Sequence, residues 1–232
     1  MKTRGCSLMV EQSLIQEKDK GSSPIQPLQF FKCGLKDVSG FIKQYHYSHS
    51  HPGGVDFAFK VTMNDVLVGA CIFGYMAGNI KASCVLRGIE DAKYYRELMR
   101  LVLLDQIEKN SESKFVGWCL RWLKKETSLK AIISFADPHY GHIGTVYQAS
   151  NWLYTGLQKS PRPRIFIADR ELHPKSCYNL YGTSSIKLLE NLGLQVSTSC
   201  REPKHRYVYV FDKTLQNRLK YEVVPYVKKT QP

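Results

Sequence analysis

The chain has 232 residues, a length that suits one large domain or one domain with extensions. Hydrophobic residues make up 43% of the chain and charged residues 23%, which is enough apolar material for a packed core. Lysine and arginine total 33 against 20 aspartate and glutamate residues. The resulting net charge of +13 favours a polyanionic partner such as nucleic acid over a basic protein without such a partner.

Seven cysteines are scattered along the chain without a Cys-x-x-Cys pair. This pattern argues against a disulfide framework or a zinc knuckle and indicates reduced, intracellular thiols. No apolar run approaches the ~20 residues that span a bilayer, and the N-terminus lacks the apolar core of a signal peptide. We therefore expect neither membrane insertion nor secretion.

The first third of the chain predicts a strand, a helix and a hairpin. Residues 1–26 are polar and irregular, so we expect a flexible N-terminal tail. Residues 28–34 predict a short strand, and apolar residues at helical spacing predict a helix within residues 35–51. Alternating apolar residues predict a hairpin over residues 55–75, with its turn at Asn64–Asp65.

The middle of the chain contains one ambiguous segment and two clearer ones. Residues 94–105 fit either a buried strand or a helix, because periodicity alone does not separate the two. Residues 113–126 predict a helix whose start Ser111 or Ser113 can cap. Residues 129–137 then predict a buried strand.

The last third alternates strands and helices. Residues 144–157 predict a short helix that runs into a strand, and a later helix has Thr183 or Ser184 as its cap and Gly193 as its end. Two further strands are predicted, at residues 164–169 and 205–212. The alternation favours an α/β or α+β fold, in which helices cover a sheet.

Proton-handling side chains follow the buried strand at its end. Asp137 stands at the C-terminal end of a central strand, where open α/β sheets place ligand sites. It could accept a proton or a hydrogen bond, or bind a metal; the alternative is an Asx-turn residue before Pro138. Its polar neighbours support a functional role, namely Ser134, His139, Tyr140 and His142.

A second polar cluster, YHYSHSH, covers residues 45–51. His46 and His49 share a face if the preceding helix continues, and His51 joins them if the chain turns back. With the phenol of Tyr47, these groups suit a borderline metal such as iron or zinc. The alternatives are a solvated helix end and an imidazole that acts as a general base near neutral pH.

Five segments together resemble the Mom family of DNA-modification proteins, known from bacteriophage Mu. They are YHYSHSH (45–51), ELMRLVLLD (97–105), FVGWCLRWLKK (115–125), ISFADPHYGHIGTVYQASNWLYTGL (133–157) and KHRYVYV (204–210). The resemblance covers roughly residues 28–212 in the same order.

The resemblance implies a GNAT-like fold, a strongly twisted mixed central β-sheet with helices on both faces. It implies a catalytic domain over residues 27–213 and leaves residues 214–232 as a basic C-terminal tail. The implied activity converts adenine in phage DNA to its carbamoylmethyl derivative at the exocyclic amine, which protects that DNA from host restriction enzymes. The implied partner is double-stranded DNA, the implied location is the cytoplasm of a bacterial host, and a homodimer is one option for the oligomeric state.

The resemblance also implies roles for particular residues. In such acyltransferases a tyrosine at the position of Tyr147 protonates a departing thiolate, and a phenol is a plausible acid for that step. The candidate catalytic residues are Asp137, Tyr147, Tyr47 and Ser134. The resemblance points to iron as a metal, for which the candidate ligands are His46, His49 and His51.

An acyl donor such as acetyl-CoA would place its pyrophosphate at the start of the helix over residues 113–126. Candidate anion ligands there are Ser111, Ser113, Lys114 and Arg100. The segment KNSESKFVG (109–117) departs from the glycine-rich signature of the acyltransferases, which weakens the case for acetyl-CoA but not for the fold. The serines could instead only cap the helix, and Arg96 or Arg100 could form a salt bridge instead of meeting a phosphate.

Adenine hides its amine inside a duplex, so we expect the base to be extruded into an aromatic pocket. Four aromatic residues could line it, although each such residue is more often part of the core: Trp152, Tyr154, Tyr75 and Tyr207. Candidate phosphate contacts are Lys124, Lys125, Arg162, Arg164, Lys204, His205 and Arg206, and they predict an affinity that falls with salt. Two alternative functions stay open: an N-acyltransferase acting on a protein or small-molecule amine, and a non-catalytic DNA-binding module.

Overall fold

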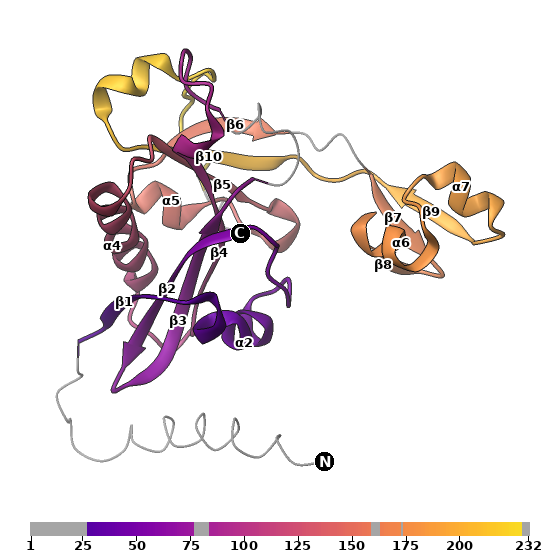
Figure 1. Ribbon diagram of the computed structural model, residues 1–232, viewed down its shortest axis with the longest axis horizontal. Helices are drawn as coiled ribbons and strands as arrows, with labels where there is room; N and C mark the ends of the chain where they lie inside the picture. The colour runs from indigo at the N-terminus through magenta and orange to yellow at the C-terminus, as the bar shows by residue number, and fades with distance from the viewer. Residues whose placement is uncertain (1–26, 77–83, 159–162, 173, 229–232) are drawn as a thin grey trace.

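The computed structural model describes residues 27–76, 84–158, 163–172 and 174–228. The expected N-terminal tail over residues 1–26 lies outside these ranges. Within them, seven strands form one sheet in the order β1-β2-β3-β4-β5-β10-β6 (Figure 1). The strands are β1 (Gln29–Cys33), β2 (Val55–Met63), β3 (Val66–Gly74), β4 (Tyr95–Leu103), β5 (Ala131–Ala136), β6 (Leu153–Gln158) and β10 (Lys204–Val210).

The sheet is mixed, because β4 and β5 run parallel while the neighbouring pairs of this sheet run antiparallel. The β2–β3 hairpin is confirmed, and Asn64 and Asp65 have φ angles of 52° and 61° in its turn. Both values lie in the left-handed region that a tight two-residue hairpin turn requires, and asparagine and aspartate tolerate that region.

The ambiguous segment around residue 98 is a strand because the core lies on both of its faces. Leu98 of β4 is buried in one apolar cluster, and the next residue, Met99, is buried in another. Side chains that alternate between two buried faces are typical of a central strand. A sequence pattern that is apolar at nearly every position cannot reveal this arrangement.

Helices cover both faces of the sheet, as expected (Figure 1). On one face lie α4 (Ser111–Glu126) and α5 (Thr145–Ala149), which share an apolar cluster with Phe59 of β2. On the other face lies α2 (Leu35–Tyr45), which packs against Ala58. Phe59 and Ala58 are adjacent in β2, so the period-two alternation of the strand separates the two layers.

Two helix ends differ from the sequence prediction. The N-cap of α4 is Asn110 in the left-handed conformation with φ of 67°, and neither expected serine caps it. The hydroxyl of Ser113 donates to the Asn110 carbonyl over 2.9 Å, while Ser111 is buried. Helix α2 ends at Tyr45, so His46 and His49 do not share a helix face.

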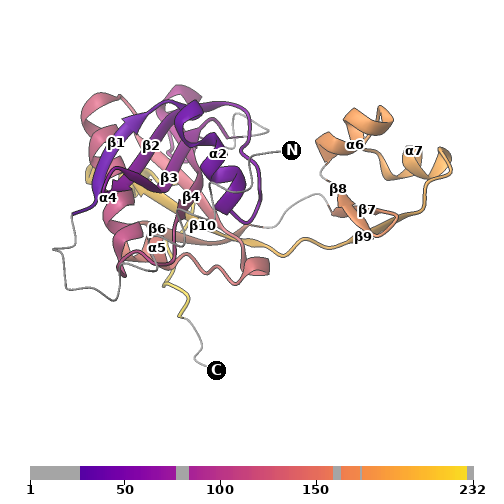
Figure 2. The same ribbon diagram turned by 90° about the horizontal axis from the view of Figure 1, so that it is seen from below.

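Residues 164–199 build a second, smaller sheet in the order β8-β7-β9, and we call this part the small lobe. Its elements are β7 (Arg164–Ile167), β8 (Arg170–Leu172), α6 (Pro174–Tyr181), α7 (Ile186–Asn191) and β9 (Val196–Ser199). The lobe stands away from the seven-stranded sheet in both views (Figures 1 and 2). The strand at β7 and the helix at α7 were predicted, but the separate sheet was not, and the N-cap of α7 is Ser185 instead of Thr183 or Ser184.

Residues 214–228 are packed, in contrast to the tail expected beyond residue 213. Leu219 is buried and forms a β-bridge with Leu86. The Val224 amide donates to the Tyr154 carbonyl over 2.9 Å, and the Tyr226 hydroxyl donates to the Trp152 carbonyl over 2.7 Å. These contacts hold residues 224–226 against the β6 side of the sheet.

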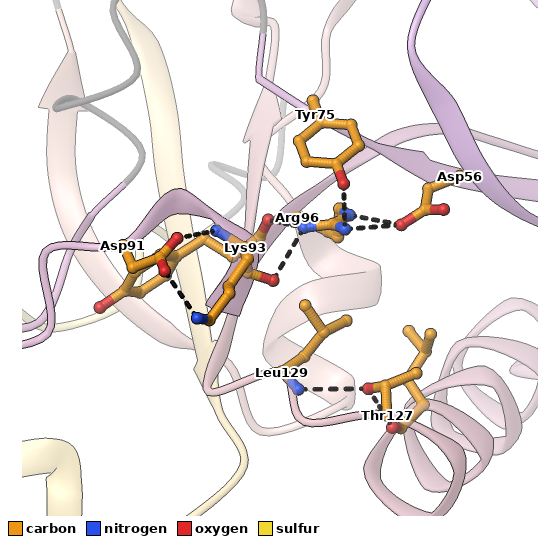
Figure 3. Close-up of polar contacts among 9 residues, drawn as sticks. Asp56, Tyr75, Asp91, Lys93, Arg96, Thr127 and Leu129 are labelled. Carbon is orange, nitrogen blue, oxygen red and sulfur yellow. Dashed lines mark hydrogen bonds and ion pairs between the residues drawn. The ribbon is translucent and has the colours of Figure 1, made fainter.

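The guanidinium of Arg96 is buried and fully engaged in structural contacts (Figure 3). Its Nε and Nη2 atoms both lie 2.7 Å from Asp56 Oδ2, and Nη2 also donates to the Tyr75 hydroxyl over 2.7 Å. Its Nη1 atom donates to the Lys93 carbonyl over 3.0 Å. Arg96 is therefore a structural ion pair between strands and is not free for a phosphate, and Tyr75 belongs to this contact instead of a base pocket.

No helix within the described ranges is both long enough and apolar enough to cross a membrane. None of the six cysteines in the part of the chain that the structure describes forms a disulfide.

Candidate active site

The site begins where β4 and β5 separate. The two strands pair over three positions only, the last of which joins Glu97 to Ile133. Beyond this point β4 continues beside β3 and β5 continues beside β10. The Ser134 hydroxyl donates to the Leu98 carbonyl over 3.0 Å across the gap, which places Ser134 at the base of the split.

A cleft of about 410 Å³ opens from this split. Its wall comes from β4, the end of β5, the loop that leads to α5, the first turn of α4 and the segment after α2. The polar side chains in the wall are His46, Tyr47, Glu97, Arg100, Glu112, Asp137, His142, Thr145, Tyr147 and Lys204. The fold thus brings Asp137, Tyr147 and Tyr47 into one cavity, with Ser134 directly beneath.

Tyr147 lies at the floor of the cleft with its hydroxyl 2.8 Å from that of Ser134. Burial raises the pKa of the Tyr147 phenol, although the Ser134 hydrogen bond opposes this shift. The phenol is therefore neutral and keeps its proton at physiological pH. Such a group can donate a hydrogen bond or a proton, but it is a poor phenolate base.

Gly144 fixes the position of Tyr147. It has φ of 82°, precedes α5, and accepts the Tyr147 amide hydrogen bond over 2.9 Å. A Cβ atom on Gly144 would overlap the ring of Tyr207, whose hydroxyl donates to the Ile143 carbonyl over 2.6 Å. Only glycine combines this backbone angle with so close an approach.

Glu97 has a proton affinity that matches neutral pH. Burial raises the pKa of its carboxyl to about 7, even though the charges of Arg100 and Lys204 lower it. A carboxyl group with this pKa can accept a proton at neutral pH. Glu97 was not among the candidate catalytic residues, because an acidic residue between Arg96 and Leu98 in a strand gives no signal of its surroundings.

Asp137 is an anion held by Lys204. The Lys204 Nζ atom lies 2.7 Å from Asp137 Oδ2, and the His139 amide donates to Oδ1 over 3.1 Å. Burial raises the pKa of Asp137, but the hydrogen bond and charge of Lys204 outweigh it and leave the pKa below its ordinary value. The aspartate therefore caps the short helix η3 (Pro138–Tyr140) and pairs with a cation, so it is a weaker base than Glu97.

Four aromatic rings meet at the mouth of the cleft. The ring of Tyr47 lies 4.2 Å from that of Tyr140, 4.2 Å from that of His46 and 5.5 Å from that of His142, measured between centroids. Burial, followed by the charge of Arg100, lowers the pKa of His46 to about 4, so this imidazole is neutral at physiological pH. Its Nδ1 atom accepts the Ser48 amide hydrogen bond over 3.1 Å, which leaves the ring proton on Nε2.

The expected histidine metal site does not form from these residues. His46 bonds to Ser48, His49 bonds to the Lys43 carbonyl over 3.1 Å, and His51 bonds to the Ser39 hydroxyl over 3.0 Å. Across the described ranges, no three histidine, cysteine, aspartate or glutamate side chains converge as a metal site would require. The physical reason is the end of α2 at Tyr45, which sends the three imidazoles in different directions.

The first turn of α4 does not fit the pyrophosphate of a coenzyme A donor. Glu112 lines the cleft at this point, and burial together with the nearby charge of Asp105 raises its pKa. Ser113 is bonded to the Asn110 carbonyl, and Lys114 lies 3.5 Å from Glu108. A pyrophosphate would thus meet the carboxyl group of Glu112, and the side chains of Ser113 and Lys114 already have partners. Of the expected anion ligands, Ser111, Ser113 and Lys114 lie outside the cleft wall, and Arg100 lies in it.

The candidate phosphate contacts that the structure describes are dispersed over the molecule, and of these only Lys204 lines the cleft. Lys124 and Lys125 lie twelve or more residues beyond Glu112 in α4, which is about 18 Å along the helix axis. Arg164 contacts His139 over 3.1 Å. Arg206 stacks on Tyr221 and donates to Thr155 over 2.8 Å, the ring nitrogen of His205 lies 2.8 Å from the Tyr154 hydroxyl, and Arg162 lies outside the described residues.

The aromatic residues expected around an extruded base are mostly in the core. Trp152, Tyr154 and Tyr207 are buried together beneath α5. They form part of the packing that supports Tyr147, whose ring lies 5.1 Å from Trp152 and 5.2 Å from Tyr207. The aromatic surface that does reach the cleft is supplied by Tyr47 and by Tyr140, which stands beside it.

Fold and cleft together define a class: an α/β protein whose mixed sheet splits at a parallel strand pair and encloses a polar site rich in proton donors and acceptors. The sequence model of the Mom protein family matches residues 28–228, which is most of the chain. The chain belongs to the Mom protein family.

One relative is the methylcarbamoylase Mom of Escherichia phage Mu. It is 29% identical over 195 residues, which cover 81% of this chain and 78% of the relative. Among solved structures, the GNAT family N-acetyltransferase YhbS from Escherichia coli, in complex with CoA, matches with a TM-score of 0.48 and 9% identity over 86% of this chain and 90% of that one. The ribosomal-protein-S18-alanine N-acetyltransferase of the same organism has a TM-score of 0.47 and 8% identity over 82% and 98% of the two chains.

Proposed function

We propose that this protein is an enzyme that installs a carbamoylmethyl group on the exocyclic amine of adenine in DNA. Membership of the Mom family and the relative named methylcarbamoylase support the reaction class. One observation carries the proposal for the site: Glu97, with a pKa of about 7, and the neutral phenol of Tyr147 line the same cleft. We place the reaction on phage DNA in the cytoplasm of a bacterial host.

The chemistry needs one group that accepts a proton and one that donates a proton. The adenine amine is a weak nucleophile because its lone pair is delocalised into the ring. In the proposed step, a bond forms between the amine nitrogen and the methylene carbon of the donor, and the bond from that carbon to its leaving group breaks. Glu97 accepts the proton that the amine loses, and Tyr147 donates a proton to the leaving group. Solvent then restores the two side chains to their starting protonation states.

The remaining polar residues position these two groups. Ser134 holds the Tyr147 hydroxyl at 2.8 Å, and the Asp137–Lys204 pair fixes the end of β5 against β10. Arg100 donates to the Ser50 and Met99 carbonyls and lines the cleft, where its charge suits a phosphate next to the reacting base. The donor reaches the cleft without a pyrophosphate at the first turn of α4, for the reasons of charge given above.

Mass spectrometry of nucleosides tests the proposal. DNA from bacteria that express the wild-type protein should contain a deoxyadenosine whose mass is raised by one carbamoylmethyl group less the hydrogen that it replaces. Glu97→Gln and Tyr147→Phe should each reduce this product at least about 100-fold. The control Glu108→Gln removes an exposed carboxylate outside the cleft and should leave the product unchanged.

The two alternative functions give different results in the same experiment. An N-acyltransferase of protein or small-molecule amines leaves deoxyadenosine unmodified and transfers its group in the absence of DNA. A non-catalytic DNA-binding protein leaves every nucleoside unmodified, and its salt-dependent affinity for DNA survives both cleft substitutions. An unmodified nucleoside profile with abundant folded protein would contradict the proposed reaction.

A further inference from the structure

We propose that Tyr47 and Tyr140 form the stacking surface that holds the extruded adenine at the mouth of the cleft. This inference rests on the proposed function and assigns its base-binding subsite. It also replaces the pocket of Trp152, Tyr154 and Tyr207 expected from the sequence, because those three side chains are buried in the core.

The two tyrosines come from segments that are distant in the sequence. Tyr47 follows the end of α2, and Tyr140 ends the short helix η3 beyond β5. Their ring centroids lie 4.2 Å apart with an angle of 36° between the planes. His46 and His142 flank Tyr47 at 4.2 and 5.5 Å, so the four rings form one continuous aromatic surface.

The rings of Tyr47 and Tyr140 are exposed to solvent, although large aromatic rings in contact are typical of a protein core. Tyr47 is 41% exposed and Tyr140 is 49% exposed, whereas Trp152 and Tyr207 are fully buried. Two contacting aromatic rings that open to water at the edge of a cleft offer a flat π-face, and every nucleobase can stack on such a face. A base on the outer face of this pair would have the polar wall of the cleft beside it.

Arg100 is the cationic side chain of the cleft that suits a phosphate. Of the two cations in the cleft wall, Lys204 is paired with Asp137, whereas Arg100 donates to the carbonyls of Ser50 and Met99. The charge of Arg100 would attract a phosphate that flanks an extruded nucleotide. The cavity of about 410 Å³ lies within the size range of pockets for small molecules, which suits a base together with a small donor group.

A binding experiment that needs no catalysis tests the stacking surface. Fluorescence anisotropy measures the affinity of the protein for a labelled duplex with one adenine that has no pairing partner, and for the same duplex with an abasic site at that position. The wild-type protein should bind the first duplex about tenfold more tightly, because stacking on one aromatic group contributes on this scale. Tyr140→Ala and Tyr140→Leu should lower the ratio severalfold, since neither new side chain has a π-face and the ring of Tyr47 alone remains.

Two variants serve as controls. Tyr140→Phe keeps the ring and should keep the ratio of the wild-type protein. Tyr178→Ala removes a tyrosine of α6 in the small lobe that is 62% exposed, and it should also leave the ratio unchanged. Because Tyr140 is exposed, its substitution should not alter the circular dichroism spectrum or the melting temperature beyond a few degrees.

The outcomes separate the stacking surface from the proposed reaction. A Tyr140→Ala protein that still prefers the unpaired adenine about tenfold would overturn the subsite, even if the wild-type protein modifies adenine in cells. A preference that depends on the Tyr140 ring, together with no modified nucleoside, would retain the adenine subsite and reject the reaction. A wild-type protein without any preference between the two duplexes would reject the subsite.

Discussion

The hydroxyl groups of Ser134 and Tyr147 lie 2.8 Å apart at the point where β4 and β5 separate. Ser134 also contacts the Leu98 carbonyl over 3.0 Å, and it has a single proton for these two neighbours. When Ser134 donates to Leu98, Tyr147 can donate to Ser134. When Tyr147 gives its proton to a leaving group, the Ser134 proton can turn to the phenolate oxygen and stabilise it.

Tyr147→Phe removes this hydroxyl and should lower the rate at least about 100-fold while the fold persists. The loss of one buried hydrogen bond should reduce the free energy of unfolding by about 1 kcal/mol. Nucleoside mass spectrometry and urea denaturation measure the two effects.

The matched control for the tyrosine is Tyr95→Phe. The Tyr95 hydroxyl is also engaged in a hydrogen bond, to the Ile89 carbonyl over 2.7 Å, but it does not line the cleft. We expect a comparable loss of stability with no loss of product. Equal losses of product in the two variants would show that Tyr147 matters for packing alone.

Glu97→Gln should abolish the rise of activity with pH. In the wild-type enzyme the base form of Glu97 accumulates as the pH rises through about 7, so the rate should increase about tenfold per pH unit below that value and level off above it. A pH–rate profile of the wild-type protein checks this, and a rate that is constant between pH 5 and 8 would exclude Glu97 as the base.

The same substitution should stabilise the fold at neutral pH. Because the pKa of Glu97 is raised in the folded state, the unfolded chain loses the proton first as the pH rises from about 4.5. Stability therefore falls between that value and about 7 and stays lower above it. Between pH 4 and pH 8, the free energy of unfolding of the wild-type protein should therefore fall by about 1–3 kcal/mol more than that of Glu97→Gln. Urea denaturation at the two pH values measures this difference.

His46 should make the free energy of unfolding fall as the pH falls, which is opposite to the effect of Glu97. Its pKa of about 4 in the folded state lies below the ordinary 6.5, so the unfolded chain binds the proton first as the pH falls. Stability is complete above about 6.5 and decreases down to about 4. Between pH 7 and pH 5, the free energy of unfolding of the wild-type protein should decrease by about 1–2 kcal/mol more than that of a His46→Asn variant.

Asp137 and Lys204 should be energetically coupled, which a double-mutant cycle with Asp137→Asn and Lys204→Met can measure. Because Asp137 is buried and Lys204 is only partly exposed, we expect a coupling of about 1 kcal/mol or more. The Asp91–Lys93 pair provides a matched comparison, because Asp91 also caps a short 3₁₀ helix and lies 2.8 Å from its lysine, but on the exposed surface (Figure 3). That pair should show a smaller coupling, and equal couplings would mean that burial at the cleft adds nothing.

Local sequence signals predicted most of the elements of the main sheet. The hairpin at Asn64–Asp65 followed from residues that tolerate left-handed angles, and α4 followed from its apolar face. The end of β5 just before Asp137 followed from an apolar run that stops at a polar residue. Each of these signals lies within a few residues of the feature it predicts, so the sequence alone contains it.

Features that depend on distant contacts could not be predicted in this way. The histidine cluster resembled a metal site until the end of α2 placed each imidazole on a different partner. Residues 214–228 are packed, in contrast to the expected tail, because Val224 and Tyr226 contact Tyr154 and Trp152, some seventy residues earlier in the chain. The sheet of the small lobe has the strand order β8-β7-β9, in which β9 pairs with β7 and not with β8, and local sequence signals do not specify this pairing.

The amino-acid sequence by itself determined the mixed strand and helix order, the family, and the presence of Asp137, Tyr147 and Tyr47 as reactive side chains. The tertiary structure decided how those side chains act. Glu97 becomes a base near neutral pH, and Asp137 becomes a paired anion, because burial and neighbouring charges control proton affinity. Both conditions are set by strands that meet only when the sheet is assembled, and no stretch of the chain contains them beforehand.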